Sequence, residues 1–204
     1  MRVLLDGEMV PVDRPTLQAA LTACASRAER RGRIIVSAAA DGLPIPDSLL
    51  AAPPDTTTDT AELTFVSATP AAVVAEMFRN AAEALGTLTQ AQREAADLVR
   101  AGRHHDAGDH LQLTFSIWQA LYQAVQSGST MIGIDMSEPI EGAGGKSPSA
   151  LIAELAATLG EVKRAIEHED WSALGDALAH DLDEAAGRWA VVTTALAEAC
   201  ERGA

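Results

Sequence analysis

Four stretches in the C-terminal part of the chain carry apolar residues at alternating spacings of four and three. The first stripe runs from Val74 to Val99, and Gln92 is its one polar member. The other three stripes lie between Ala107 and Val125, Ile152 and Ile166, and Leu174 and Ala199. This spacing keeps the apolar side chains on one face of a helix. We therefore expect four amphipathic helices over residues 70–204.

The connections between these helices indicate how they are arranged. Short turns near Gly102 and Glu169 join the first helix to the second and the third to the fourth, so each pair should be antiparallel. The connection between the second and third helices, at about residues 128–147, is longer and rich in glycine. The pattern predicts an antiparallel four-helix bundle with one long glycine-rich loop.

Residues 1–69 alternate short β-type runs with turn signals. Asp6-Gly7 stands between two apolar runs, which is a strong signal for a two-residue hairpin turn. The predicted order is hairpin, helix, strand, short helical turn and strand: Arg2–Leu5, Glu8–Val12, Leu17–Ala28, Arg33–Ala40, Asp47–Ala51 and Glu62–Ser67.

This order of elements resembles the β-grasp, or ubiquitin-like, fold, and the resemblance covers about 68 residues and rests on topology. We predict an α+β protein with a small β-grasp-like N-terminal head at residues 1–69, followed by the antiparallel four-helix bundle at residues 70–204. The resemblance implies a head that binds or packs against another molecule, although a fold does not fix a function.

The charge of the chain limits its partners. There are 15 Lys and Arg against 29 Asp and Glu, which gives a net charge of −14. An acidic surface repels phosphate backbones and anionic lipid, so we expect no nucleic-acid partner and no membrane partner. The chain starts without an apolar signal segment and holds no 18-residue apolar run, which predicts a cytoplasmic protein.

The densest cluster of metal-ligand residue types is His104–His110. On a helix, His105 and Asp109 would lie one turn apart, and His110 and His180 could add imidazole ligands from two helices. None of the histidines follows the Glu-x-x-His pattern of di-iron bundles. We predict no cofactor, and a metal-binding helical-bundle enzyme stays open as an alternative.

Three aromatic residues, Phe115, Trp118 and Tyr122, share one side of the second predicted helix. Trp118 belongs to the apolar stripe, and Phe115 and Tyr122 widen it sideways. They either pack inside the protein or form an exposed edge for a partner helix or a second copy. No nucleophile elbow or CxxC pair is present, so the leading hypothesis is a non-enzymatic protein-interaction module, adaptor-like or chaperone-like, with a protein partner or a homo-oligomer.

The helical part also resembles the flagellin secretion chaperone. The matching features are Thr69-Pro70 before the first helix, the Ala101-Gly102 turn and the Glu169-Asp170-Trp171 opening of the fourth helix. The resemblance implies a flagellar-type export chaperone, with a groove that holds an export substrate. The chain departs from that family in having the 69-residue head and a longer acidic loop.

Overall fold

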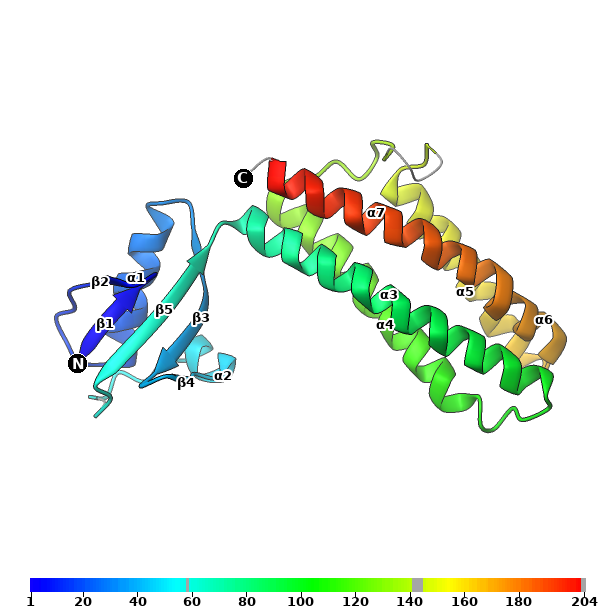
Figure 1. Cartoon of the computed structure of the whole chain (residues 1–204), viewed down its shortest axis with the longest axis horizontal. Coiled ribbons are helices and arrows are strands. Elements are labelled where there is room, and N and C mark those ends of the chain that lie inside the picture. The colour runs from blue at the N-terminus through cyan, green and yellow to red at the C-terminus, as the bar shows by residue number, and fades with distance from the viewer. Residues whose placement is uncertain (58, 141–144, 203–204) are drawn as a thin grey trace. The chain divides into compact units, whose positions relative to one another are not determined.

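The computed structural model describes residues 1–57, 59–140 and 145–202 of the chain. It consists of two compact units, one over residues 1–73 and one from residue 74 onward. The α+β class is confirmed: a mixed sheet with helices comes first, and a bundle of long packed helices follows (Figure 1).

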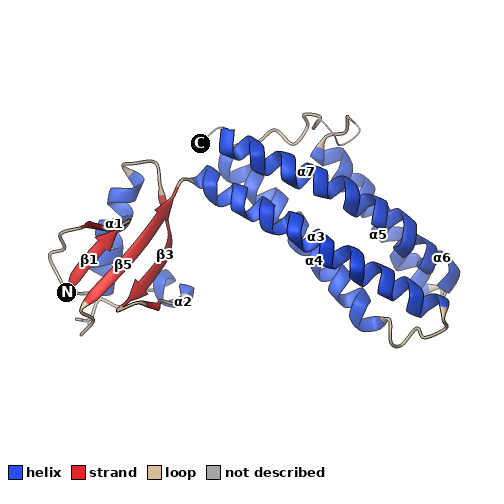
Figure 2. Ribbon diagram, in the orientation of Figure 1, coloured by secondary structure: helices blue, strands red, loops and turns tan. Residues whose placement is uncertain are grey.

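The first unit is built on a five-stranded sheet, drawn in red in Figure 2. Its strands are β1 (Arg2–Leu5), β2 (Glu8–Met9), β3 (Ile34–Ala40), β4 (Leu43–Pro44) and β5 (Glu62–Ala68). The spatial order is β2-β1-β5-β3-β4, in which β1 and β5 are parallel and the other neighbours are antiparallel. A parallel pair needs a crossover connection, and the segment between β1 and β5 supplies it.

The helices of this unit are α1 (Leu17–Glu29) and α2 (Asp47–Ala51). The side chain of Thr16 caps α1 by accepting a hydrogen bond from the Ala19 N–H at 3.1 Å. Leu5, Cys24 and Phe65 are among the residues of its apolar core. The predicted return strand at Glu8–Val12 is shorter in the structure, because Pro11 has no N–H to continue the ladder.

The second unit consists of long helices that follow one another along the chain. They are α3 (Pro70–Arg100), α4 (Gly108–Ile132), α5 (Pro148–Glu167), α6 (Trp171–Asp176), a π-helical turn η1 (Ala177–Asp181) and α7 (Leu182–Arg202). Arg79 pairs with Glu201 and Arg93 with Asp183, so α3 and α7 run in opposite directions. Their apolar faces meet in one core with those of α4 and α5.

Helix α4 crosses α3 at close range. A Cβ on Gly128 would lie 2.9 Å from Phe78 and 3.0 Å from Val74, so this position has no room for a side chain. At the other end of the pair, His110 Nδ1 lies 3.0 Å from Glu94 Oε2. These contacts make α3 and α4 antiparallel.

The second helix begins at Gly108, whereas the prediction placed His105 on it. Gly102, at φ +72°, ends α3, and residues 103–107 then form turns in which the Asp106 and Ala107 N–H groups donate to the Arg103 carbonyl. His105 is therefore outside the helix, and the predicted one-turn spacing between His105 and Asp109 is wrong.

The fourth predicted helix is interrupted by η1. Leu174, Leu178, Leu182 and Ala185 are all buried, yet their spacings are four, four and three. In a regular α-helix, two successive spacings of four residues would turn the later apolar side chains away from the core. The π turn η1 has more residues per turn, so the side chains on both sides of it still face the core. At the far end of the stripe Ala199 is exposed, and the neighbouring position is buried instead.

The connection between α4 and α5 starts after Ile132, not at residue 128, because α4 continues further than predicted. Ile134, Met136 and Ile140 pack against the core, and the Ser149 N–H donates to the Met136 carbonyl at 3.0 Å. Part of the glycine-rich loop, residues 141–144, lies outside the described residues.

Candidate functional site

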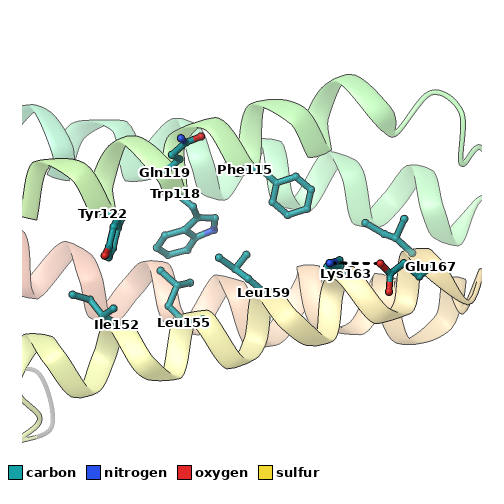
Figure 3. A pocket seen from close by; sticks show the side chains of 11 residues that line it. Phe115, Trp118, Gln119, Tyr122, Ile152, Leu155, Leu159, Lys163 and Glu167 are labelled. Atoms are coloured by element: carbon teal, nitrogen blue, oxygen red, sulfur yellow. Dashed lines mark ion pairs between the residues drawn. The ribbon is translucent and has the colours of Figure 1, made fainter. Parts of the chain in front are cut away.

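An apolar groove of about 510 Å³ lies between α4 and α5 (Figure 3). Its lining residues come from these two helices: Phe115, Trp118, Gln119, Tyr122, Ile152, Leu155, Ala156, Leu159, Lys163, Ile166 and Glu167. It therefore contains all three aromatic residues that the sequence singled out.

Local sequence fixes both walls of the groove. Helix α5 starts where Ser147 accepts a hydrogen bond from the Ala150 N–H at 3.3 Å, with Pro148 in the first turn. Helix α4 stops at Gly133, whose φ of +70° allows its N–H to donate back to the Ser129 carbonyl. The two helices run antiparallel, so Tyr122 lies opposite Ile152 and Phe115 lies towards the Glu167 end (Figure 3).

The three aromatic side chains differ in burial. Trp118 is 2% exposed and belongs to the core of the bundle. Phe115 is partly buried, whereas Tyr122 is 42% exposed at one end of the groove. The core interpretation therefore fits Trp118, and Phe115 and Tyr122 form the edge of the groove.

Trp118 brings a polar group into this apolar setting. Its indole nitrogen Nε1 is buried and has no hydrogen-bond partner among the described residues. Figure 3 shows the ring between the two helices, with the nitrogen on the side of Leu159. A buried indole N–H usually finds an acceptor, so this nitrogen is an unpaired polar group in the core beside the groove.

The α4 side of the groove carries few charges. No Asp, Glu, Lys, Arg or His occurs over residues 111–134, a run of 24 residues that is the longest uncharged run in the chain. The exposed positions along α4 are instead mostly Gln, Ser and Thr. Among the lining residues only Lys163 and Glu167 are charged, and they face each other at 3.7 Å at one end.

Glu154 is a charged residue near the middle of α5 that does not line the groove. Lys146 Nζ lies 2.6 Å from its carboxylate, and Arg188 approaches from α7. The hydrogen bond from Lys146 holds the pKa of Glu154 below its ordinary value, so the carboxylate stays ionised within this ion pair.

The structure does not bring the candidate metal ligands together. His105 is exposed in the turn before α4, Asp109 and His110 are in the first turn of α4, and His180 is exposed in η1. Within the described residues, no three His, Cys, Asp or Glu side chains are grouped so that they could hold a metal ion.

His104, beside these candidates, has a structural contact that the sequence did not predict. Its ring stacks on Trp171 with centroids 4.0 Å apart and planes at 10°. The stack joins the α3–α4 turn to the start of α6, so it closes one end of the bundle.

The two thiols are poorly suited to act as nucleophiles. Cys24 and Cys200 are both buried, and burial raises the pKa of Cys24 to about 11 and also raises the pKa of Cys200. A protonated thiol is a weak nucleophile, so neither cysteine is prepared for covalent chemistry at neutral pH.

A second hollow, of about 500 Å³, lies in the first unit, between Leu17, β4 and the segment that leads into β5. Its wall mixes apolar side chains with Thr56, Thr57 and Asp59. Because its lining is less uniform and includes none of the predicted site residues, the α4–α5 groove is the better candidate.

Comparison with known proteins gives no relative: no family model, no curated protein and no solved structure matches the chain. Among the described helices, none combines the length and the apolar character needed to cross a membrane. The groove is therefore the feature of this chain that best indicates a function.

The uncharged run is the signal that sequence reasoning missed. Ile152, Leu155 and Leu159 were assigned to a core stripe, and nothing in their spacing separates a core position from a groove wall. A charge-free stretch on the outside of an acidic protein is unusual enough to have indicated a contact face.

Proposed function

We propose that this chain is a non-enzymatic protein-interaction module whose α4–α5 groove binds an apolar helix face of another protein molecule. The observation that supports it most is the groove of about 510 Å³, which is lined mostly by apolar side chains and is bordered on the α4 side by an uncharged surface. Large exposed apolar surfaces of this kind mark contact sites on soluble proteins.

The spacing of the lining residues favours a helix as the occupant. Along α4 the lining side chains advance by three or four residues from Phe115 to Trp118 and Tyr122, which is about 5 Å per helical turn. A bound helix presents its own anchors at i, i+3 or i+4, and i+7 with the same rise.

The first unit supports the same class of function. The strand order β2-β1-β5-β3-β4, with a parallel central pair and a helix between β2 and β3, agrees with a β-grasp head. In the proposed module this head is a second contact domain, and its own partner is left open.

A flagellar-type export chaperone is a narrower version of the proposal. The groove favours it, because a chaperone of this type would keep an apolar helix of its substrate covered before export. The narrower version requires a partner that binds in an unfolded state, whereas an adaptor also binds a folded one, so the state of the captured partner separates the two.

Photo-crosslinking from inside the groove tests the proposal. We would place benzoylphenylalanine at Gln119, which lines the groove and is exposed, and irradiate the full-length protein in its native lysate. Discrete adducts with protein are expected. The matched control is the same group at Gly187 on α7, where an added Cβ meets nothing within 4 Å and where adducts should be absent.

A second variant ties the adducts to the groove. Ala156→Arg places a charge on the wall of the groove, and it should remove the adducts from position 119 while the circular dichroism spectrum stays unchanged. Position 119 giving no adducts, or giving the same adducts in the Ala156→Arg background, would rule out the groove as a binding site.

A further inference from the structure

We infer that the molecule in the groove is a second copy of this chain, paired across a two-fold axis that passes close to the middle of α4. The inference rests on the proposed function, because it names the partner of the same site. Three observations carry it: the charge pattern, the size of the face, and the shape that the face offers.

The charge pattern is the strongest of the three. Each copy carries a net charge of −14, so two copies repel one another over most of their surface. In a two-fold interface the same patch meets itself, and a charge near the axis faces its own like charge. Self-pairing of so acidic a chain therefore requires a face with few charges. Residues 111–134 supply an uncharged α4 side, and the two charged lining residues on α5, Lys163 and Glu167, pair with each other at one end of the groove.

A partner with a different sequence would favour a charged contact surface on this chain. A strongly acidic protein gains association rate and specificity by offering its acidic patches to a basic partner. The α4 face has no acidic patch over residues 111–134 that could attract a basic partner, although acidic residues are plentiful on the neighbouring helices. The outer side of α7, for comparison, carries Glu184, Glu198 and Glu201.

The face is large enough for a stable dimer. Helix α4 has 25 residues, so it is about 37 Å long, and α4 and α5 side by side are about 20 Å wide. Covering this face would remove roughly 700 Å² from each copy, or roughly 1,400 Å² in total, which lies within the usual range for specific interfaces.

The face also offers an exposed aromatic ring and a hollow, which a self-complementary patch can pair across a two-fold axis. Tyr122 is 42% exposed at one end of the groove, while the hollow continues past Phe115 towards Leu159. With α4 antiparallel to α4 of the other copy, each Tyr122 ring would enter the opposite hollow.

Sedimentation equilibrium of the full-length protein over a wide concentration range provides the first test. We expect the mass of a dimer that dissociates reversibly on dilution. A mass that stays at the monomer value at every concentration overturns the inference.

A charge exchange at the middle of α4 provides the second test. Gln119→Glu places like charges opposite each other, and we expect it to raise the dimer dissociation constant by roughly tenfold or more. Gln119→Lys should do the same, and an equimolar mixture of the two variants should recover tight pairing. Ala199→Glu, on the exposed side of α7, is the matched control and should leave the dimer intact.

The outcomes separate this inference from the proposed function. Adducts from position 119 that contain only other proteins leave the groove as a binding site and overturn self-pairing. A dimer that ignores both Gln119 variants forms through another face and also overturns it. If position 119 gives no adducts at all, the proposed function and the inference both fail.

Discussion

Gln92 is the polar residue inside the apolar stripe of α3, and its surroundings leave it unpaired. The side chain is fully buried, and neither Nε2 nor Oε1 meets a hydrogen-bond partner in the part of the chain that the structure describes. On folding, an amide in this position loses its hydrogen bonds to water and gains none from the protein, which costs about 1–3 kcal/mol of stability.

Replacing this amide should therefore stabilise the bundle. Gln92→Met keeps the length of the side chain and removes the unpaired groups, so we expect the free energy of unfolding to rise by about 1–3 kcal/mol. Urea unfolding followed by circular dichroism measures the change. A loss of stability would mean that the amide makes a favourable interaction in solution.

Asp6 contributes a pH-dependent part of the stability of the head. Its carboxylate accepts hydrogen bonds from Ser67 Oγ at 2.6 Å and from the Ser67 N–H at 2.8 Å, and Arg33 lies beyond them. These contacts, the Ser67 hydroxyl first, hold the pKa of Asp6 below its ordinary value.

The direction of the pH effect follows from the lowered pKa. The ionised form is favoured in the folded state, so the stabilisation is complete above the pKa of an unfolded aspartate and is lost as the pH falls through the folded value. Asp6→Asn, which tolerates the same φ of +51°, should be less stable than the parent at neutral pH. In urea titrations the difference should shrink in acid; a constant difference would contradict the assignment.

At the scale of elements, the crossing of α3 and α4 depends on one missing side chain. The Cβ of Gly128→Ala would lie 2.8 Å from Met77 Cε and 2.9 Å from Phe78 Cζ, closer than carbon atoms approach. We expect this substitution to cost about 1–3 kcal/mol of stability through displaced core side chains.

The matched control is another helical glycine that has open space around it. Gly187→Ala on α7 meets nothing within 4 Å, so it should stabilise the bundle by about 0.5–1 kcal/mol through its better helix propensity. Thermal unfolding of both variants should show shifts of opposite sign. Equal shifts would indicate that the close approach at Gly128 is absent in solution.

Element types were predictable where periodicity and turn chemistry agreed. The turn at Asp6-Gly7 and a second Asp-Gly turn at Asp41-Gly42 adopt positive φ at both positions, and each of the four helical stripes corresponds to helical structure. The start of α4 was not predictable from periodicity, because Arg103 and Asp106 pair within a turn that delays the helix. The π turn left a readable trace, the repeated spacing of four at Leu174 and Leu178, although the stripe was taken for a regular helix.

For the whole molecule, the two units have separate apolar cores, and each core contains one cysteine. Cys24 reports on the first unit and Cys200 on the second. Phe65→Ala should cost the first unit about 3–5 kcal/mol and so accelerate thiol labelling at Cys24 alone. Leu178→Ala should accelerate labelling at Cys200 alone.

Mass spectrometry of labelled peptides distinguishes the two thiols in this experiment. The parent protein should label slowly at both, because both thiols are buried and their pKa values are raised. If either variant accelerates both thiols equally, the units unfold as one.

Only the α4 wall of the candidate groove was predictable from the sequence. Phe115, Trp118 and Tyr122 stood out because they share one side of α4, but the opposite wall comes from α5, thirty or more residues later in the chain. No local pattern states that α5 faces α4 across an open groove, since that depends on how far apart packing leaves the two helices.

The scarcity of charged residues along α4 also decides how this protein can be studied. Lys146 and Lys163 are the only lysines in the sequence, and none lies on α4. Cross-linking reagents that react with amines or carboxylates therefore have no reactive side chain over residues 111–134. Trypsin, which cuts after Lys and Arg, leaves that whole stretch in the single peptide between Arg103 and Lys146. Standard proximity mapping would miss an assembly built on this surface, even if it were fully formed.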